Sequence, residues 1–154
     1  WQVLEVSGLP ILQEGKMKYP NDNTALDQIF SNGSAPSIEE FTGEYWVNML
    51  TGMIPNFRWA GHRKRFFSEN GNTIGKNIIL SNITFGHFKV EWGQCSDLND
   101  LEVIVLNYGN KKNLMTRPVR DKIRRIEHGQ YLGRYYNVIK GTYRFKGYFS
   151  LEKR

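Results

Sequence analysis

From residue 43 onward, the chain is a series of short segments rich in aromatic and β-branched residues, separated by turns. Segments of this kind at regular spacing are typical of an antiparallel barrel or sandwich. The clearest turn is Asn70-Gly71 in "SENGN", a pair that favours a two-residue hairpin loop. About eight strands are expected, at 43–50, 58–67, 76–80, 84–92, 101–108, 117–127, 130–138 and 142–153. We therefore predict an all-β fold, an antiparallel barrel of about eight strands.

The first 36 residues have a different pattern. Asn23 and Thr24 can cap a short helix that includes Leu26 and Phe30, and a loop rich in Gly, Pro and Ser follows. We predict that residues 1–36 are irregular or helical and form a lid or plug. A chain of 154 residues can bury a core, so one domain over 1–154 is expected. The chain opens at Trp1 without a methionine, so we expect a trimmed or processed start.

Segment 117–127 places charges on both of its faces, because strand side chains alternate between faces. Asp121 and Arg125 share a face with Val119 and Ile123, and the opposite face is expected to point outward with Arg120, Lys122 and Arg124. A carboxylate on an apolar face is costly unless it is paired. Asp121 is therefore either one member of an internal ion pair, with Arg65, Arg125 or Arg134, or the anchor of a ligand.

The same stretch resembles a GXWXG-type bacterial family of unknown function. The matching positions are Pro118, Val119, Asp121, Ile123, Arg124, Ile126, Leu132 and Gly133. With the closing strand "YFSLEK", the resemblance covers about residues 117–153. It implies a calycin-like or lipocalin-like barrel and no particular chemistry.

Gly43-Glu44-Tyr45-Trp46 is similar to the Gly-x-Trp with which lipocalin-like barrels enter their first strand, although it is not a clean Gly-x-Trp-x-Gly. That resemblance implies that Trp46 closes the barrel floor, with Arg144 or Arg134 stacked on its ring. The alternative is that Trp46 is simply part of the core. Both interpretations are structural.

Charge is uneven along the chain. Residues 1–57 hold two basic and seven acidic side chains, and residues 111–154 hold thirteen basic and three acidic ones. Such asymmetry can mark a surface for nucleic acid or acidic lipid. The basic segment 61–67 lacks the RNP-type signature of RNA-binding sheets, so nucleic acid is not the partner that we expect.

The remaining motifs argue against several kinds of chemistry. His62, His87 and His128 have no close spacing, so no metal site is predicted. No phosphate-binding glycine motif or serine-nucleophile turn is present, and no cofactor is expected. Cys95 is the single cysteine, which favours a reducing compartment such as the cytoplasm. No run of eighteen apolar residues indicates a transmembrane helix.

Our leading hypothesis is a barrel that binds an apolar or amphipathic small molecule, such as a lipid, polyketide, isoprenoid or pigment. The expected ligand-binding residues are Tyr45, Trp46, Trp59, Phe66, Phe88, Trp92, Tyr108, Arg125 and Phe145. The alternative is a cofactor-free cyclase, isomerase or lyase in the same pocket. Its candidate catalytic residues are Asp121, His62, His87 and Tyr135. A third class is a basic surface for nucleic acid or acidic membrane; the oligomeric state is left open.

Overall fold

The computed structural model describes residues 11–13 and 16–154, and within them eight strands form a closed antiparallel barrel. A two-stranded hairpin of β1 (Ile11–Gln13) and β2 (Lys16–Lys18) precedes α1 (Asn23–Asn32). The short helical turns η1 (Ile38–Glu40) and η2 (Phe57–Ala60) flank the first barrel strand. The barrel strands are β3 (Gly43–Met49), β4 (Arg63–Glu69), β5 (Asn72–Ile79), β6 (Ile83–Cys95), β7 (Leu101–Asn107), β8 (Val119–Glu127), β9 (Gln130–Ile139) and β10 (Thr142–Lys153).

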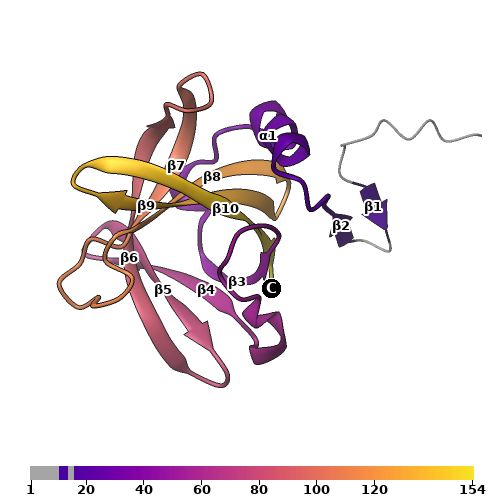
Figure 1. The fold of residues 1–154 in the computed structure, drawn as a ribbon. Coiled ribbons are helices and arrows are strands. Elements are labelled where there is room, and N and C mark those ends of the chain that lie inside the picture. Colours follow the sequence, from indigo (N-terminus) through magenta and orange to yellow (C-terminus); the bar gives the residue numbers. More distant parts are fainter. Residues whose placement is uncertain (1–10, 14–15) are drawn as a thin grey trace, which may run out of the picture.

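The barrel follows the order of the chain, because each strand pairs with the next one and β10 closes the ring on β3 (Figure 1). Closure leaves the barrel itself without a free strand edge. The predicted all-β barrel with a short N-terminal helix is confirmed. The hairpin predicted at Asn70-Gly71 is present, with positive φ at both residues, as a two-residue turn of this kind requires.

Antiparallel order places the connections alternately at the two ends of the barrel. Four connections lie at one end, which we call the mouth: 50–62, 80–82, 108–118 and 140–141. At the opposite end, the tight connections 70–71, 96–100 and 128–129 alternate with them. The two long loops of the barrel, 50–62 and 108–118, therefore both border the mouth.

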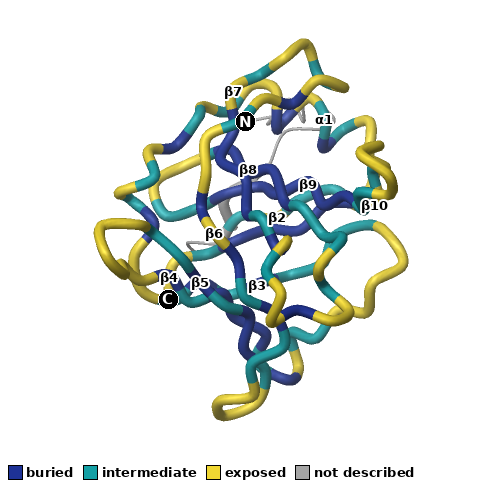
Figure 2. Tube along the Cα trace, turned by 90° about the vertical axis from the view of Figure 1, so that its left-hand side faces the viewer, coloured by how far each residue is buried: buried dark blue, intermediate teal, exposed yellow. Residues whose placement is uncertain are grey.

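Side chains fill the half of the interior away from the mouth. Phe41, just after η1, packs its ring 5.0 Å from the rings of both Phe66 and Tyr131 and closes that end. Ser37 donates its backbone N–H to the Glu40 carboxylate over 2.6 Å, the contact expected from their capping-box spacing. The strands are buried along much of their length and the connections are exposed (Figure 2).

A second layer covers part of the outer wall. Leu26, Ile29 and Phe30 of α1 are buried against outward-facing residues of the barrel. The helix is capped by Asp22, one residue before the predicted cap. Because α1 packs outside the barrel, residues 23–32 do not plug it (Figure 1). Residues 1–10, 14 and 15 of the proposed lid lie outside the described residues, and the side chains of residues 11–13 and 16 are not described.

The outer layer also changes the expected environment of the outward charges. Lys122 and Arg124 do point outward from β8, but both are buried, which corrects the expectation of a solvated face. Arg124 donates to the carbonyl oxygens of Phe30 and Gly33 and so caps the C-terminal end of α1. Arg134 pairs with Asp27 of α1 and with Asp97. These arginines hold the outer layer against the wall and are not available to a ligand.

Two inward-facing glycines make room for aromatic rings. A Cβ on Gly133 would lie 2.2 Å from the ring of Phe149, and one on Gly75 would lie 2.4 Å from the ring of Phe88. A ring cannot give way as a flexible chain can, so we expect Gly133→Ala to lower the free energy of unfolding by about 1–3 kcal/mol. Denaturant unfolding measures this loss. The Phe149→Leu background should reduce it; an equal loss there would contradict the proposed clash.

Candidate functional site

A cavity of about 90 Å³ lies inside the barrel at the mouth, above the packed half of the interior. Its lining combines apolar side chains with a group of buried polar ones. The lining residues are Val47, Met49, Ile54, His62, Lys64, Asn77, Phe85, Tyr108, Thr116, Val119, Asp121, Tyr135 and Phe149.

The centre of the polar group is an ion pair across the barrel. Lys64 Nζ lies 3.2 Å from Asp121 Oδ2, and both side chains are about 95% buried or more. β4 and β8 are four positions apart in a ring of eight strands, so the two charges come from opposite walls. Burial raises the pKa of Asp121 and lowers that of Lys64, while their mutual attraction opposes both shifts.

Hydrogen bonds complete the group around Lys64. Its ammonium donates to Asn77 Oδ1 over 2.7 Å and to Tyr108 Oη over 2.6 Å. Asn77 Nδ2 donates to Tyr108 Oη over 2.8 Å, and the Tyr108 hydroxyl donates to Asp121 over 3.2 Å. All three ammonium protons therefore have partners, as a buried charge requires. We call Lys64, Asp121, Tyr108, Asn77 and His62 the buried polar cluster.

His62 is the member of the buried polar cluster with an unused polar atom. Its Nε2 lies 3.3 Å from Asn77 Oδ1, and its buried Nδ1 has no hydrogen-bond partner. Asn77 Oδ1 already accepts from Lys64 and can only accept, so the hydrogen-bond network assigns the imidazole proton to Nε2 and leaves Nδ1 as an acceptor. Burial, then the charges of Lys64 and Arg63, lower the pKa of His62 to about 3. The ring is therefore neutral at pH 7.

Four of the residues proposed from the sequence meet at this cavity. His62, Tyr108, Asp121 and Tyr135 all line it, and Tyr135 donates its hydroxyl to the carbonyl of Thr51 in the 50–62 loop. Tyr45, Phe66 and Phe88 also face inward, but they fill the packed half beneath the cavity. The partner of Asp121 is Lys64, which corrects the expectation of Arg65, Arg125 or Arg134.

The other proposed ligand-binding residues do not line the interior. Trp59 and Trp92 are exposed at 81% and 58%. Arg125 lies at the opposite end, 3.2 Å from Glu40, and Phe145 packs in the outer layer under the guanidinium of Arg134. Trp59 lies on the 50–62 loop, and Phe145 faces outward from its strand. Trp92 and Arg125 lie at the end of the barrel away from the cavity.

Trp46 faces outward, because Tyr45 beside it faces inward and side chains alternate. The guanidinium groups of Arg58 and Arg154 lie over its ring at 4.7 Å and 4.9 Å from the centroid. The expected stacking of Arg144 or Arg134 on a Trp46 at the barrel floor is therefore wrong. Phe41 closes that end instead.

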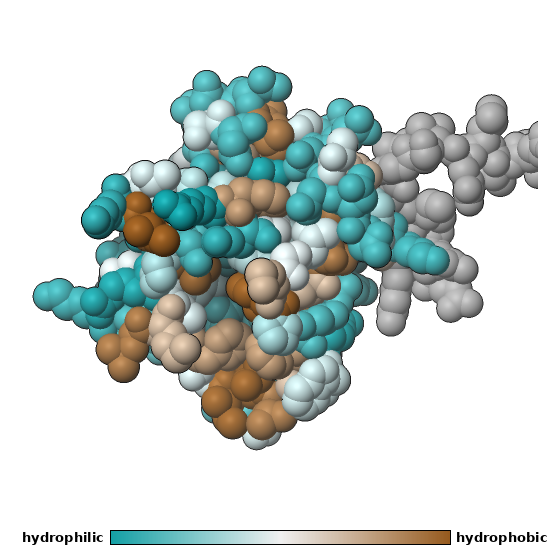
Figure 3. All heavy atoms as spheres, viewed as in Figure 1, coloured by the Kyte–Doolittle hydropathy of each residue, from teal (hydrophilic) through white to brown (hydrophobic). Residues whose placement is uncertain are grey.

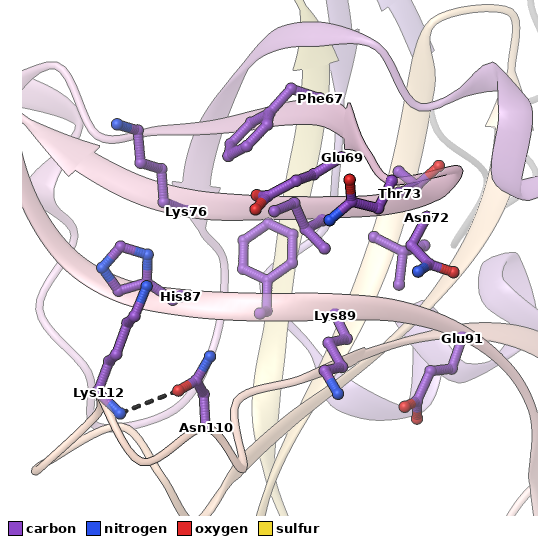
Figure 4. A pocket seen from close by; sticks show the side chains of 15 residues that line it. Phe67, Glu69, Asn72, Thr73, Lys76, His87, Lys89, Glu91, Asn110 and Lys112 are labelled. Atoms are coloured by element: carbon purple, nitrogen blue, oxygen red, sulfur yellow. Dashed lines mark hydrogen bonds between the residues drawn. The ribbon is translucent and has the colours of Figure 1, made fainter.

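His87 lies in a different place, an open groove of about 540 Å³ on the outer face of β4, β5 and β6. Figure 4 shows Lys76, Phe67 and Glu69 on the upper side of this groove and His87, Lys89 and Lys112 on the lower side. Its charged side chains are mostly exposed and make no cluster comparable to the one around Lys64. His87 and His62, both candidate catalytic residues, therefore lie in different places and cannot act together as an acid and a base.

Two kinds of site residue escaped the sequence reasoning. Lys64 and Asn77 were not proposed, although "HRKRF" alternates and His62, Lys64 and Phe66 share a face. The inward-facing Phe66 would have been the signal that Lys64 also points inward. By simple alternation Phe85 would share the outward face of His87, but an irregularity between Thr84 and Gly86 brings it into the cavity lining, 5.1 Å from the His62 ring.

Comparisons with known proteins support the fold. No family model matches the chain, so the resemblance of residues 117–153 to the GXWXG-type family stays a prediction. No curated protein matches it. The chain is similar to the crystal structure of a protein from Thermomonospora curvata, with a TM-score of 0.60 and 12% identity over 86% of this chain and 88% of that one. At this identity, the likeness carries the barrel fold alone.

Two further observations concern the described residues only. Among residues 11–13 and 16–154, no group of three or more His, Cys, Asp or Glu side chains could hold a metal ion. In the same part of the chain, no helix has the length and hydrophobicity needed to cross a bilayer.

Proposed function

We propose that the barrel binds a small amphipathic molecule in the cavity at its mouth. The observation that supports this proposal is an apolar cavity that borders a buried ion pair and a neutral histidine with an unpartnered acceptor atom. Apolar walls with a few convergent polar groups are the usual composition of a ligand site. A buried ion pair is weak evidence of stabilisation by itself, so a role in binding is proposed for this pair because it borders the cavity.

The size of the cavity narrows the ligand. About 90 Å³ is well below the roughly 300–1,000 Å³ of pockets that enclose a drug-sized molecule. A small molecule, or one end of a lipid, polyketide, isoprenoid or pigment, fits this proposal better than a whole large ligand. Because His62 Nδ1 is an acceptor and the protons of Lys64 are all used, we expect the ligand to offer a hydroxyl or N–H donor.

Native mass spectrometry of gently purified protein tests the proposal. We expect a discrete excess mass that disappears on denaturation. Val47→Phe, which adds a ring to the cavity wall, should abolish it, and Asn72→Phe on an exposed strand end away from the mouth is the control. A folded wild-type protein without bound mass is then titrated with hexanol and hexanoate. Tighter binding of the alcohol supports the proposed donor; no binding of either contradicts the proposal.

A second candidate function is cofactor-free proton-transfer catalysis on the same molecule. It is favoured by the position of His62, which lines the cavity and has an unpartnered Nδ1 that can accept a proton. Wild-type and His62→Gln proteins should then release chemically different molecules after incubation with the same extract. Release of the same molecule from both favours binding without conversion.

A further inference from the structure

Exposed apolar side chains gather at the mouth. Among the described residues, nine exposed large hydrophobic side chains lie there: Met53, Ile54, Trp59, Leu80, Ile83, Leu114, Met115, Ile139 and Tyr143. The other two, Phe67 and Trp92, lie away from the mouth. Met53, Leu114 and Met115 are exposed at 99%, 87% and 91%, at the tips of the two long loops. The concentration exceeds the scattered apolar residues of an ordinary surface.

All four mouth connections contribute to this rim, although they are far apart in the sequence. The loop 108–118 appears in orange at the left of Figure 1, and the space-filling view shows hydrophobic residues among hydrophilic ones along the left and lower edges of the same face (Figure 3). We call these nine side chains, with the basic residues of the four connections, the mouth rim.

The charge of the mouth rim is of one sign. The four connections hold Arg58, Lys111, Lys112, Arg117 and Lys140, and no aspartate or glutamate. Acidic residues lie instead at the opposite end, at Glu69, Asp97, Asp100 and Glu127. An anionic partner would therefore be attracted to the mouth.

From this combination we propose that the mouth rim docks onto an anionic lipid surface. Leucine, methionine and isoleucine side chains insert among acyl chains, while nearby lysine and arginine side chains contact anionic headgroups. Single-stranded nucleic acid would require stacking platforms, but most rim side chains are aliphatic. Docking would point the cavity at the bilayer, yet it does not depend on what the cavity binds.

Vesicle co-sedimentation tests the docking. The wild-type protein should bind vesicles of phosphatidylcholine with about a third phosphatidylserine, bind phosphatidylcholine alone much less, and lose affinity as salt rises. Lys111→Glu with Lys112→Glu should weaken binding at least about thirtyfold, since each lysine near an anionic surface contributes about fivefold. Met53→Ser with Leu114→Ser and Met115→Ser should weaken it comparably. These side chains are exposed, so the variants should fold, which circular dichroism checks.

The matched controls are Lys89→Glu and Trp92→Ser, an exposed lysine and an exposed large apolar residue that both lie away from the mouth. Both should bind anionic vesicles as the wild type does. The proposal is overturned if the wild type does not bind these vesicles at low salt, or if the controls weaken binding as much as the rim variants. It is also overturned if the rim variants instead abolish binding to single-stranded RNA or self-association while vesicle binding persists.

Discussion

Asp121→Asn is expected to lower the free energy of unfolding by about 3–5 kcal/mol. The substitution keeps the shape of the side chain and removes the charge opposite Lys64. Lys64 is only 4% exposed, so water cannot replace the lost carboxylate fully. An unpaired buried charge costs more than the pair contributes, so the loss should exceed that of an ordinary polar substitution. Chemical denaturation at pH 7 measures it.

Two further variants show whether the loss comes from the stranded charge. Lys64→Met combined with Asp121→Asn leaves no buried charge and should recover much of the stability. Glu127→Gln removes an exposed carboxylate from the same strand and should change the free energy of unfolding by less than about 0.5 kcal/mol. A loss below about 1 kcal/mol in Asp121→Asn would show that Lys64 is not held as a desolvated cation.

The second large effect concerns pH. The pKa of His62 is lowered to about 3 in the fold, against about 6.5 in the unfolded chain. Below pH 6.5 the unfolded state takes up a proton that the folded state resists. Keeping His62 neutral in the fold therefore has no cost above pH 6.5, and the free energy of unfolding decreases as the pH falls from 6.5 toward 3. Between pH 7 and pH 4, this one group should lower the free energy of unfolding by about 3 kcal/mol.

Comparison with His62→Gln isolates this contribution, because the carboxylates that titrate over the same range are common to both proteins. The stability of the wild type should fall by about 3 kcal/mol more than that of His62→Gln between pH 7 and pH 4. The pKa of His87 in the outer groove is also lowered, by partial burial and the charges of Lys112 and Lys76, but its imidazole is partly exposed. His87→Gln should therefore depart from the wild type much less than His62→Gln does. Parallel curves for the wild type and His62→Gln would mean that His62 titrates in the fold as it does in the unfolded chain.

Much of the fold could be predicted because its determinants are local. The two-residue alternation and the Asn70-Gly71 turn are properties of adjacent residues, and they locate all eight barrel strands to within a few residues, apart from residues 58–62. There η2 and His62 precede β4, because Asn56 caps a helical turn through Arg58. Alternation also predicted correctly that Asp121 and Ile123 face inward.

The candidate site could be predicted only in part. Asp121 was expected to need a partner, but in one dimension Arg65, Arg125 and Arg134 satisfy that need as well as Lys64 does. Only the closed ring, in which β4 stands opposite β8, selects Lys64. Trp59 and Trp92 were assigned to a pocket by residue type, yet Trp59 is exposed on a loop and Trp92 is exposed at the end of the barrel away from the mouth.

Local patterns were enough to predict the barrel class, the approximate positions of its strands and the inward position of Asp121, because alternation and turn chemistry act between neighbouring residues. The tertiary structure decided what those residues meet. It decided that Lys122 and Arg124 are covered by an outer layer, that Lys64 crosses the interior to Asp121, and that four separate loops form one cationic and apolar mouth rim. Burial and pairing between distant residues depend on closure of the whole chain, which no local pattern specifies.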